Sequence, residues 1–130
     1  MYQSVTDHIK VTVVPQFIEG QSNPAENKFV WAYTITMENQ GLETVTLLTR
    51  HWQITDGIGR RQDVRGDGVV GEQPTLGPGQ SFQYTSGCPL NTPSGLMVGS
   101  YSMMAATGRS FNVAIPAFSL DSPHDRHSVN

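Results

Sequence analysis

The strict alternation of apolar residues in one segment constrains the fold of this chain most strongly. Phe29, Trp31, Tyr33, Ile35 and Met37 occupy every second position. Successive side chains of a β-strand point to opposite faces, so this row predicts a long strand with one buried face. A helix would instead need apolar residues at intervals of three to four.

Shorter alternating patterns predict six further strands, bounded by turn residues. Pro15 cannot donate to a strand ladder, so the first of these strands is expected at a sheet edge or at a bulge. Hairpin turns are expected at 56–59 and at Gly108-Arg109. The six predicted strands cover residues 8–18, 44–55, 60–65, 82–85, 96–106 and 110–118.

Simple alternation also assigns faces within the predicted strand 44–55. It places Leu48, Arg50, Trp52 and Ile54 on one face. It places Val45, Leu47, Thr49, His51 and Gln53 on the opposite face. The charged strand 60–65 is expected at an exposed sheet edge, because charge discourages edge-to-edge pairing.

These patterns predict an all-β protein. The chain has 130 residues, including 13 glycines and 8 prolines, and its long segment 66–80 is interrupted by both types, so no helix can pass through it. About seven antiparallel strands in one domain fit an immunoglobulin-like or fibronectin type III-like β-sandwich. We expect one domain over residues 1–120 and a flexible C-terminal tail over 121–130.

Composition excludes several classes of protein. A single cysteine, Cys88, leaves no internal disulfide and no cysteine-ligated zinc site. The net charge is −3 with only eight lysines and arginines, which argues against non-specific binding to nucleic acid. There is no long apolar run and no signal-peptide pattern, so we expect no membrane association and a cytoplasmic location.

Several contiguous motifs lie between Arg50 and Met103. They are Arg50-His51-Trp52-Gln53-Ile54-Thr55-Asp56, Val64-Arg65-Gly66-Asp67-Gly68-Val69-Val70-Gly71, Pro74, Pro78-Gly79, Tyr84-Thr85-Ser86-Gly87 and Gly95-Leu96-Met97-Val98-Gly99-Ser100-Tyr101. Through these motifs the chain resembles the ApaG family, also called CorD, and Trp31-Ala32-Tyr33 extends the resemblance over nearly the whole chain.

The resemblance implies a stand-alone bacterial domain with a fibronectin-type sandwich. It also implies a link to magnesium and cobalt tolerance. Related domains occur in eukaryotic F-box proteins and in a polymerase-delta-interacting protein, as modules thought to bind partners. The family has no established enzymatic activity, so we expect a protein that is not an enzyme and needs no cofactor.

The segment Gly66, Asp67, Gly68, Gly71 matches the pattern G-x-G-x-x-G. A dinucleotide-binding fold needs a helix after this loop, and Pro74 excludes one. Two interpretations remain. The glycines serve loop geometry, or their backbone N–H groups form an anion-binding nest. Arginines suit phosphate groups, and four lie nearby in the sequence: Arg50, Arg60, Arg61 and Arg65.

Other candidate residues carry weaker signals. His51 shows no nucleophile or orienting acid in its sequence surroundings, and Cys88 shows nothing nearby to lower its pKa, so both are expected to be structural. His124 and His127 are weak metal-ligand candidates, because imidazole suits cobalt.

The leading hypothesis is a non-enzymatic module that binds an unidentified protein partner through the loop 66–71 and its arginines, with an indirect link to metal tolerance. The alternative is a weak pyrophosphate or nucleotide binder at the same loop. Homodimerisation through a sheet edge or face stays open.

Overall fold

A computed structural model describes residues 1–125 of the chain, and nine strands account for most of them. Two short 3₁₀ turns, η1 (Glu19–Gln21) and η2 (Pro24–Glu26), interrupt the loop before the third strand. The strands are β1 (Tyr2–Thr6), β2 (Ile9–Phe17), β3 (Phe29–Asn39), β4 (Val45–Asp56), β5 (Arg61–Asp67), β6 (Thr75–Leu76), β7 (Ser81–Leu90), β8 (Gly95–Ala105) and β9 (Ser110–Leu120).

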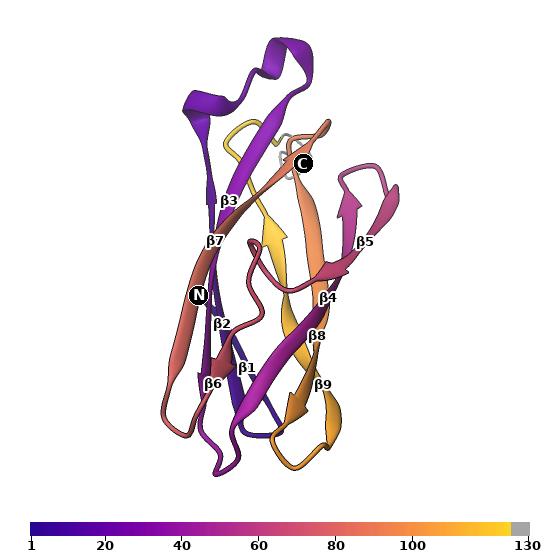
Figure 1. The fold of residues 1–130 in the computed structure, drawn as a ribbon. Helices are drawn as coiled ribbons and strands as arrows, with labels where there is room; N and C mark the ends of the chain where they lie inside the picture. Colours follow the sequence, from indigo (N-terminus) through magenta and orange to yellow (C-terminus); the bar gives the residue numbers. More distant parts are fainter. Residues whose placement is uncertain (126–130) are drawn as a thin grey trace.

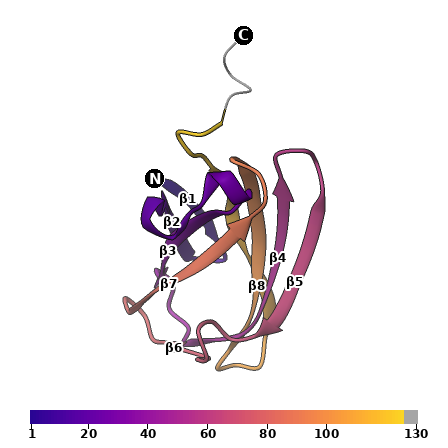
Figure 2. The ribbon, with the colours of Figure 1, turned by 90° about the horizontal axis from the view of Figure 1, so that it is seen from above.

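The strands form two antiparallel sheets that pack face to face as a β-sandwich (Figure 1). One sheet has the order β1-β2-β3-β7, and the other has the order β5-β4-β8-β9 with β6 added to β4. Seen from above, the two layers lie side by side, and the segment that carries β6 runs between them (Figure 2). The predicted all-β sandwich is therefore confirmed.

Within the described range, no helix has the length and apolar character needed to cross a membrane.

All seven predicted strands are present, and β1 and β6 are additional. The prediction that the strand with Pro15 lies at a sheet edge was wrong, because β1 pairs with β2 from Ile9 to Val13. Pro15 lies just beyond this pairing and faces Tyr33 of β3. The missing N–H of the proline is thus accommodated where β2 has lost its outer neighbour.

The face assignment for β4 was correct after Leu48 but wrong for Val45 and Leu47, because the strand contains a β-bulge. Leu47 pairs with Met103, whereas Thr49 pairs with the next residue, Ser102, so Leu48 is an extra residue in β4. The bulge reverses the alternation. On the N-terminal side of the bulge, Val45 and Leu47 therefore face the core. On its C-terminal side, the row of Arg50, Trp52 and Ile54 faces inward. A second bulge places an extra residue at 116–117 of β9.

The apolar rows predicted from the sequence form one core between the sheets. All five members of the β3 row are buried, together with Trp52, Tyr101 and Phe118 of the facing sheet. Trp52 and Phe118 meet edge to face with 5.9 Å between ring centroids, a favourable aromatic geometry. At the edge where β1 meets β9, the Tyr2 hydroxyl lies 2.9 Å from the Ser119 hydroxyl.

The first residues of the predicted tail contact the sandwich. The Trp31 indole donates a hydrogen bond to the backbone carbonyl of Asp121 at 2.7 Å. Ser122 Oγ donates to the Pro93 carbonyl at 2.6 Å. His124 packs its ring against Phe17. Residues 126–130 lie outside the described part of the chain.

Close packing between β4 and β8 predicts that Gly99→Ala destabilises the protein. A Cβ there would lie 2.5 Å from the His51 carbonyl oxygen and 2.9 Å from Cε3 of Trp52. We expect a loss of about 2–3 kcal/mol in the free energy of unfolding, measured by urea denaturation. Gly87→Ala is the matched control, because its Cβ would meet only the Trp31 carbonyl oxygen at 3.5 Å. Equal losses in the two variants would contradict the packing argument.

Candidate functional site

The bulge in β4 anchors the glycine-rich loop. The carbonyl oxygen of Leu48 accepts hydrogen bonds from Gly68 N–H at 2.8 Å and from Gln73 Nε2 at 2.9 Å. Gly68 has φ +62°, and a Cβ there would lie 2.3 Å from the Glu72 carbonyl oxygen. Only glycine satisfies both constraints, so the loop after β5 has a fixed path.

Beyond this anchor, residues 69–72 form a tight turn that we call the Val70 turn. Val69 and Glu72 exchange both backbone hydrogen bonds, at 2.8 and 2.9 Å. The central residues, Val70 and Gly71, have φ values of +43° and +82°, the pattern of a type I′ turn. Val69 is buried, whereas Val70 is 55% exposed. A β-branched residue at positive φ is strained, so the turn holds an exposed apolar side chain in a costly conformation.

Arg50 holds the loop from the inner side of β4. Its Nη1 donates to the carbonyl oxygens of Asp67 and Gly68 at 3.0 and 2.9 Å. A Cβ on Gly66 would lie 2.9 Å from both terminal guanidinium nitrogens, so the absence of one makes room for Arg50.

The backbone of the loop offers Arg50 carbonyl oxygens, whereas an anion nest would need free N–H groups. The N–H groups of Gly68, Val69 and Glu72 all donate to backbone carbonyls. The nest predicted for residues 66–71 therefore does not form from these amides.

The predicted arginines do not converge on the loop. Arg60 pairs with Asp56 at 2.8 Å, in the predicted turn after β4. Arg61 pairs with Asp63 at 3.1 Å. Arg65 is exposed on β5, and residues 1–125 provide it with no ion-pair partner. Of the four, Arg50 and Arg65 are thus the two that border cavities beside the loop.

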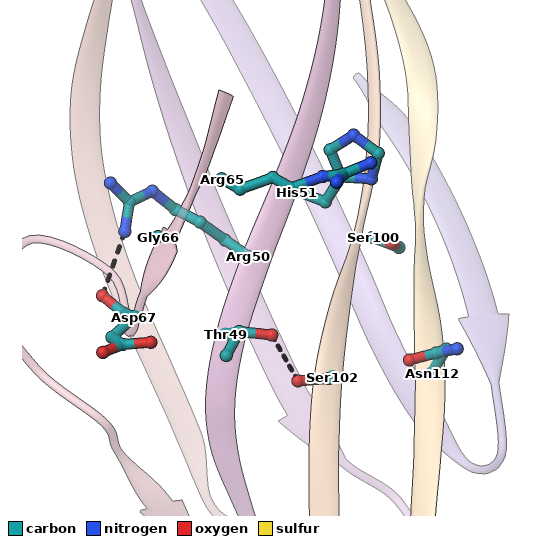
Figure 3. A pocket seen from close by; sticks show the side chains of 9 residues that line it. All are labelled: Thr49, Arg50, His51, Arg65, Gly66, Asp67, Ser100, Ser102 and Asn112. Atoms are coloured by element: carbon teal, nitrogen blue, oxygen red, sulfur yellow. Dashed lines mark hydrogen bonds between the residues drawn. The ribbon is translucent and has the colours of Figure 1, made fainter. Parts of the chain in front are cut away.

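Arg65 borders a hollow of about 520 Å³ on the outer face of the β5-β4-β8-β9 sheet, which we call the polar hollow (Figure 3). Thr49 and Ser102 share a hydroxyl–hydroxyl hydrogen bond across β4 and β8. The Arg65 side chain extends across β4 toward the His51 ring (Figure 3). The polar hollow is lined by Thr49, Arg50, His51, Arg65, Gly66, Asp67, Ser100, Ser102 and Asn112.

The structure gives His51 an acidic partner that sequence analysis missed. His51 Nε2 lies 3.0 Å from Asp63 Oδ2. Hydrogen bonds from His51 and then from Arg61 lower the pKa of Asp63. The predicted hairpin turn contained the signal, because it aligns Gln53 with Asp63 and so places the carboxylate diagonally beside His51. Ionised Asp63 fixes the orientation of the imidazole.

The remaining reactive groups are buried and neutral. Cys88 lies within β7, and burial raises the pKa of its thiol to about 11. Burial likewise raises the pKa values of the phenols of Tyr33, Tyr84 and Tyr101. The Tyr84 and Tyr101 hydroxyls share a 2.5 Å hydrogen bond between the sheets. A thiol with this pKa is a poor nucleophile at neutral pH.

The weak metal-ligand candidates divide between two regions. His124 Nε2 lies 3.1 Å from Glu19 Oε1, and its ring lies beside Phe17 and Phe29. His127 falls outside the described residues. Among residues 1–125, no three His, Cys, Asp or Glu side chains gather in a way that could hold a metal ion.

The fold and site define a small single-domain antiparallel β-sandwich with a hydrogen-bonded glycine-rich loop beside a polar hollow. Residues 19–105 match the model of the ApaG domain. The chain is 63% identical to Protein ApaG of Rhodospirillum centenum and 58% identical to that of Mesorhizobium japonicum, each over the full length of both chains. This chain belongs to the ApaG family.

A solved structure supports the same assignment. The crystal structure described as an ApaA protein from Bordetella pertussis superposes with a TM-score of 0.87 at 46% sequence identity. The alignment covers 90% of this chain and 95% of that one. The fibronectin-type sandwich that the resemblance implied is thus supported by a close structural relative.

The strain in the Val70 turn predicts that Val70→Asn stabilises the protein. Asparagine tolerates positive φ far better than valine, so we expect a gain of about 1 kcal/mol in the free energy of unfolding. Val5→Asn is the matched control, because Val5 is 58% exposed but lies in β1. That variant should lose a few tenths of a kcal/mol, roughly the strand propensity of valine. A Val70→Asn variant no more stable than the wild type would show that the turn is unstrained.

Proposed function

We propose that this protein is a non-enzymatic binding module that recognises a protein partner through the Val70 turn and the adjoining loop 66–73. The observation that carries the proposal is Val70 itself, which is exposed, apolar and strained. Strained residues persist where the surrounding structure enforces them, and they cluster at sites of function. An exposed apolar side chain on a fixed turn is suited to insertion into a pocket of a partner.

Rigidity of the loop supports this function. Buried Val69, the Arg50 guanidinium and the Leu48 carbonyl hold the base of the turn from three sides. A loop held in its binding conformation loses little entropy on association. The turn can therefore contribute to affinity although it exposes few residues.

A role outside catalysis is supported by the state of the reactive groups. The Cys88 thiol is buried, and burial raises its pKa and those of the Tyr33, Tyr84 and Tyr101 phenols, so these groups are neutral at physiological pH. We further propose that any contribution to magnesium or cobalt tolerance is indirect and passes through the partner.

Capture of partners from cell extract tests the role of the turn. We expect Val70→Asp to lose the specific partner that the wild type retains, because a charge cannot enter an apolar pocket without a large desolvation cost. Val70→Asn should weaken capture although it stabilises the fold. Leu42→Asp is the matched control, because Leu42 is 95% exposed on a different loop. Equal capture by the wild type and Val70→Asp would exclude the turn as the recognition edge.

A second candidate, weak binding of pyrophosphate or a nucleotide, is favoured by Arg65, which has no ion-pair partner among residues 1–125 and lies beside the hydroxyl groups of the polar hollow. The Arg65 guanidinium, rather than the backbone N–H groups of the loop, would then bind the anion. The carboxylate of Asp67 on the same rim opposes an anion, which keeps the expected affinity low.

Titration of ¹⁵N-labelled protein with pyrophosphate tests this candidate at about 0.15 M salt, where loose contacts are screened. We expect saturable shifts around Arg65, His51 and Ser100, and their loss in Arg65→Gln. Arg109→Gln is the control, because Arg109 pairs with Glu43 at 2.8 Å at the far end of the sheet. An absence of saturable shifts in the wild type would remove this candidate.

A further inference from the structure

The open side of the sandwich contains a cavity that the proposed function does not use. Strands β7 and β5 are edge strands on the same side of the two sheets, and each pairs with one neighbour. Between them lies a cavity of about 360 Å³, which we call the edge cleft. Its volume falls within the range of small-molecule sites. It is lined by Tyr33, Arg50, Trp52, Ile54, Gln62, Val64, Ser86, Gly87, Cys88, Pro89 and Met97.

Much of the wall of the edge cleft is apolar and uncharged. Trp52, Ile54 and Met97 belong to the core, and Val64 packs against it from β5. The Tyr33 and Trp52 rings meet edge to face with 5.4 Å between centroids. Burial raises the pKa values of Tyr33 and Cys88, so both are neutral at physiological pH. This wall fits a flat or branched hydrocarbon body.

Arg50 alone carries a formal charge among the described residues that line the edge cleft. Its Nη1 is engaged with the carbonyls of Asp67 and Gly68. Within residues 1–125, no carboxylate pairs with Arg50, and its Nε and Nη2 have no hydrogen-bond partner. In Figure 3 the second terminal nitrogen points away from Asp67. One edge of a partly buried guanidinium is therefore free to bind an anion.

We propose that the edge cleft binds a small organic carboxylate with an apolar body. The carboxylate accepts two parallel hydrogen bonds from Nε and Nη2 of Arg50, a geometry that guanidinium and carboxylate groups share. The body lies against Trp52 and Val64. A phosphate dianion fits less well, because one partly buried cation leaves its second charge uncompensated. The site differs in ligand class and position from the partner-binding turn, so each can fail without the other.

A matched pair of probes tests the site on the wild-type protein. We expect 3-phenylpropionate to shift the Trp52 indole N–H and the amides of residues 86–88 in a saturable manner. The Trp31 indole, which donates to the Asp121 carbonyl, is an internal reference that should stay in place. The uncharged analogue 3-phenylpropionamide should bind at least about tenfold more weakly, since hydrogen bonds between two charged groups are lost. Equal affinities, shifts outside the edge cleft or no saturable shift would overturn the proposal.

Two variants test whether Arg50 binds the carboxylate of the probe. Arg50→Gln should weaken 3-phenylpropionate binding at least about tenfold, whereas Arg65→Gln removes the same charge from the neighbouring strand and should leave the affinity within about twofold. Loss in both variants, or in neither, would overturn the assignment to Arg50. If Arg50→Gln does not fold, Val64→Trp tests the site instead. The larger side chain fills the edge cleft and leaves Arg50 in place, so binding of 3-phenylpropionate should be lost. Binding retained by Val64→Trp would likewise overturn the proposal.

Discussion

The bulge at Leu48 is the constraint on which the site depends. One extra residue lets both halves of β4 contribute apolar side chains to the same core. It turns Arg50 inward, where the guanidinium meets the loop carbonyls. It also directs the Leu48 carbonyl to Gly68 and Gln73. A regular β4 would satisfy only one half of the core or point Arg50 to solvent, and the loop would lose its anchors.

Local periodicity explains how much of this structure could be predicted. The row from Phe29 to Met37 encodes burial directly, so β3 and the sandwich class were predictable. The bulge in β4 could not be predicted, because one added residue leaves two short alternating patterns of apolar residues, and each of them looks regular. The strand β1 was not predicted, because its side chains are only half buried or exposed and so give no clear apolar alternation. The Asp63–His51 pair could have been predicted, since the turn at 56–59 sets the register between β4 and β5.

The glycine-rich motif shows why residue types alone do not define the geometry of a site. In the sequence, glycines and arginines together suggest a phosphate-binding loop. In the structure, Gly66 and Gly68 serve steric needs, and the amides of Gly68, Val69 and Glu72 donate to backbone carbonyls. Arg50 stands between the Val70 turn and the edge cleft, so a ligand in one place would act on the same guanidinium that holds the other. The two proposed sites are thus physically linked although they bind different chemistry.

The contact between β1 and β9 has a consequence for how the chain acquires its structure. Tyr2 and Ser119 meet although 117 positions separate them. Pairing β1 with β2 is local and can occur early, whereas the opposite layer needs the last strand before it can close over the core. Such non-local closure slows folding. During synthesis, the core therefore stays incomplete until β9 is available, because this last strand supplies Val113, Ile115 and Phe118 to it.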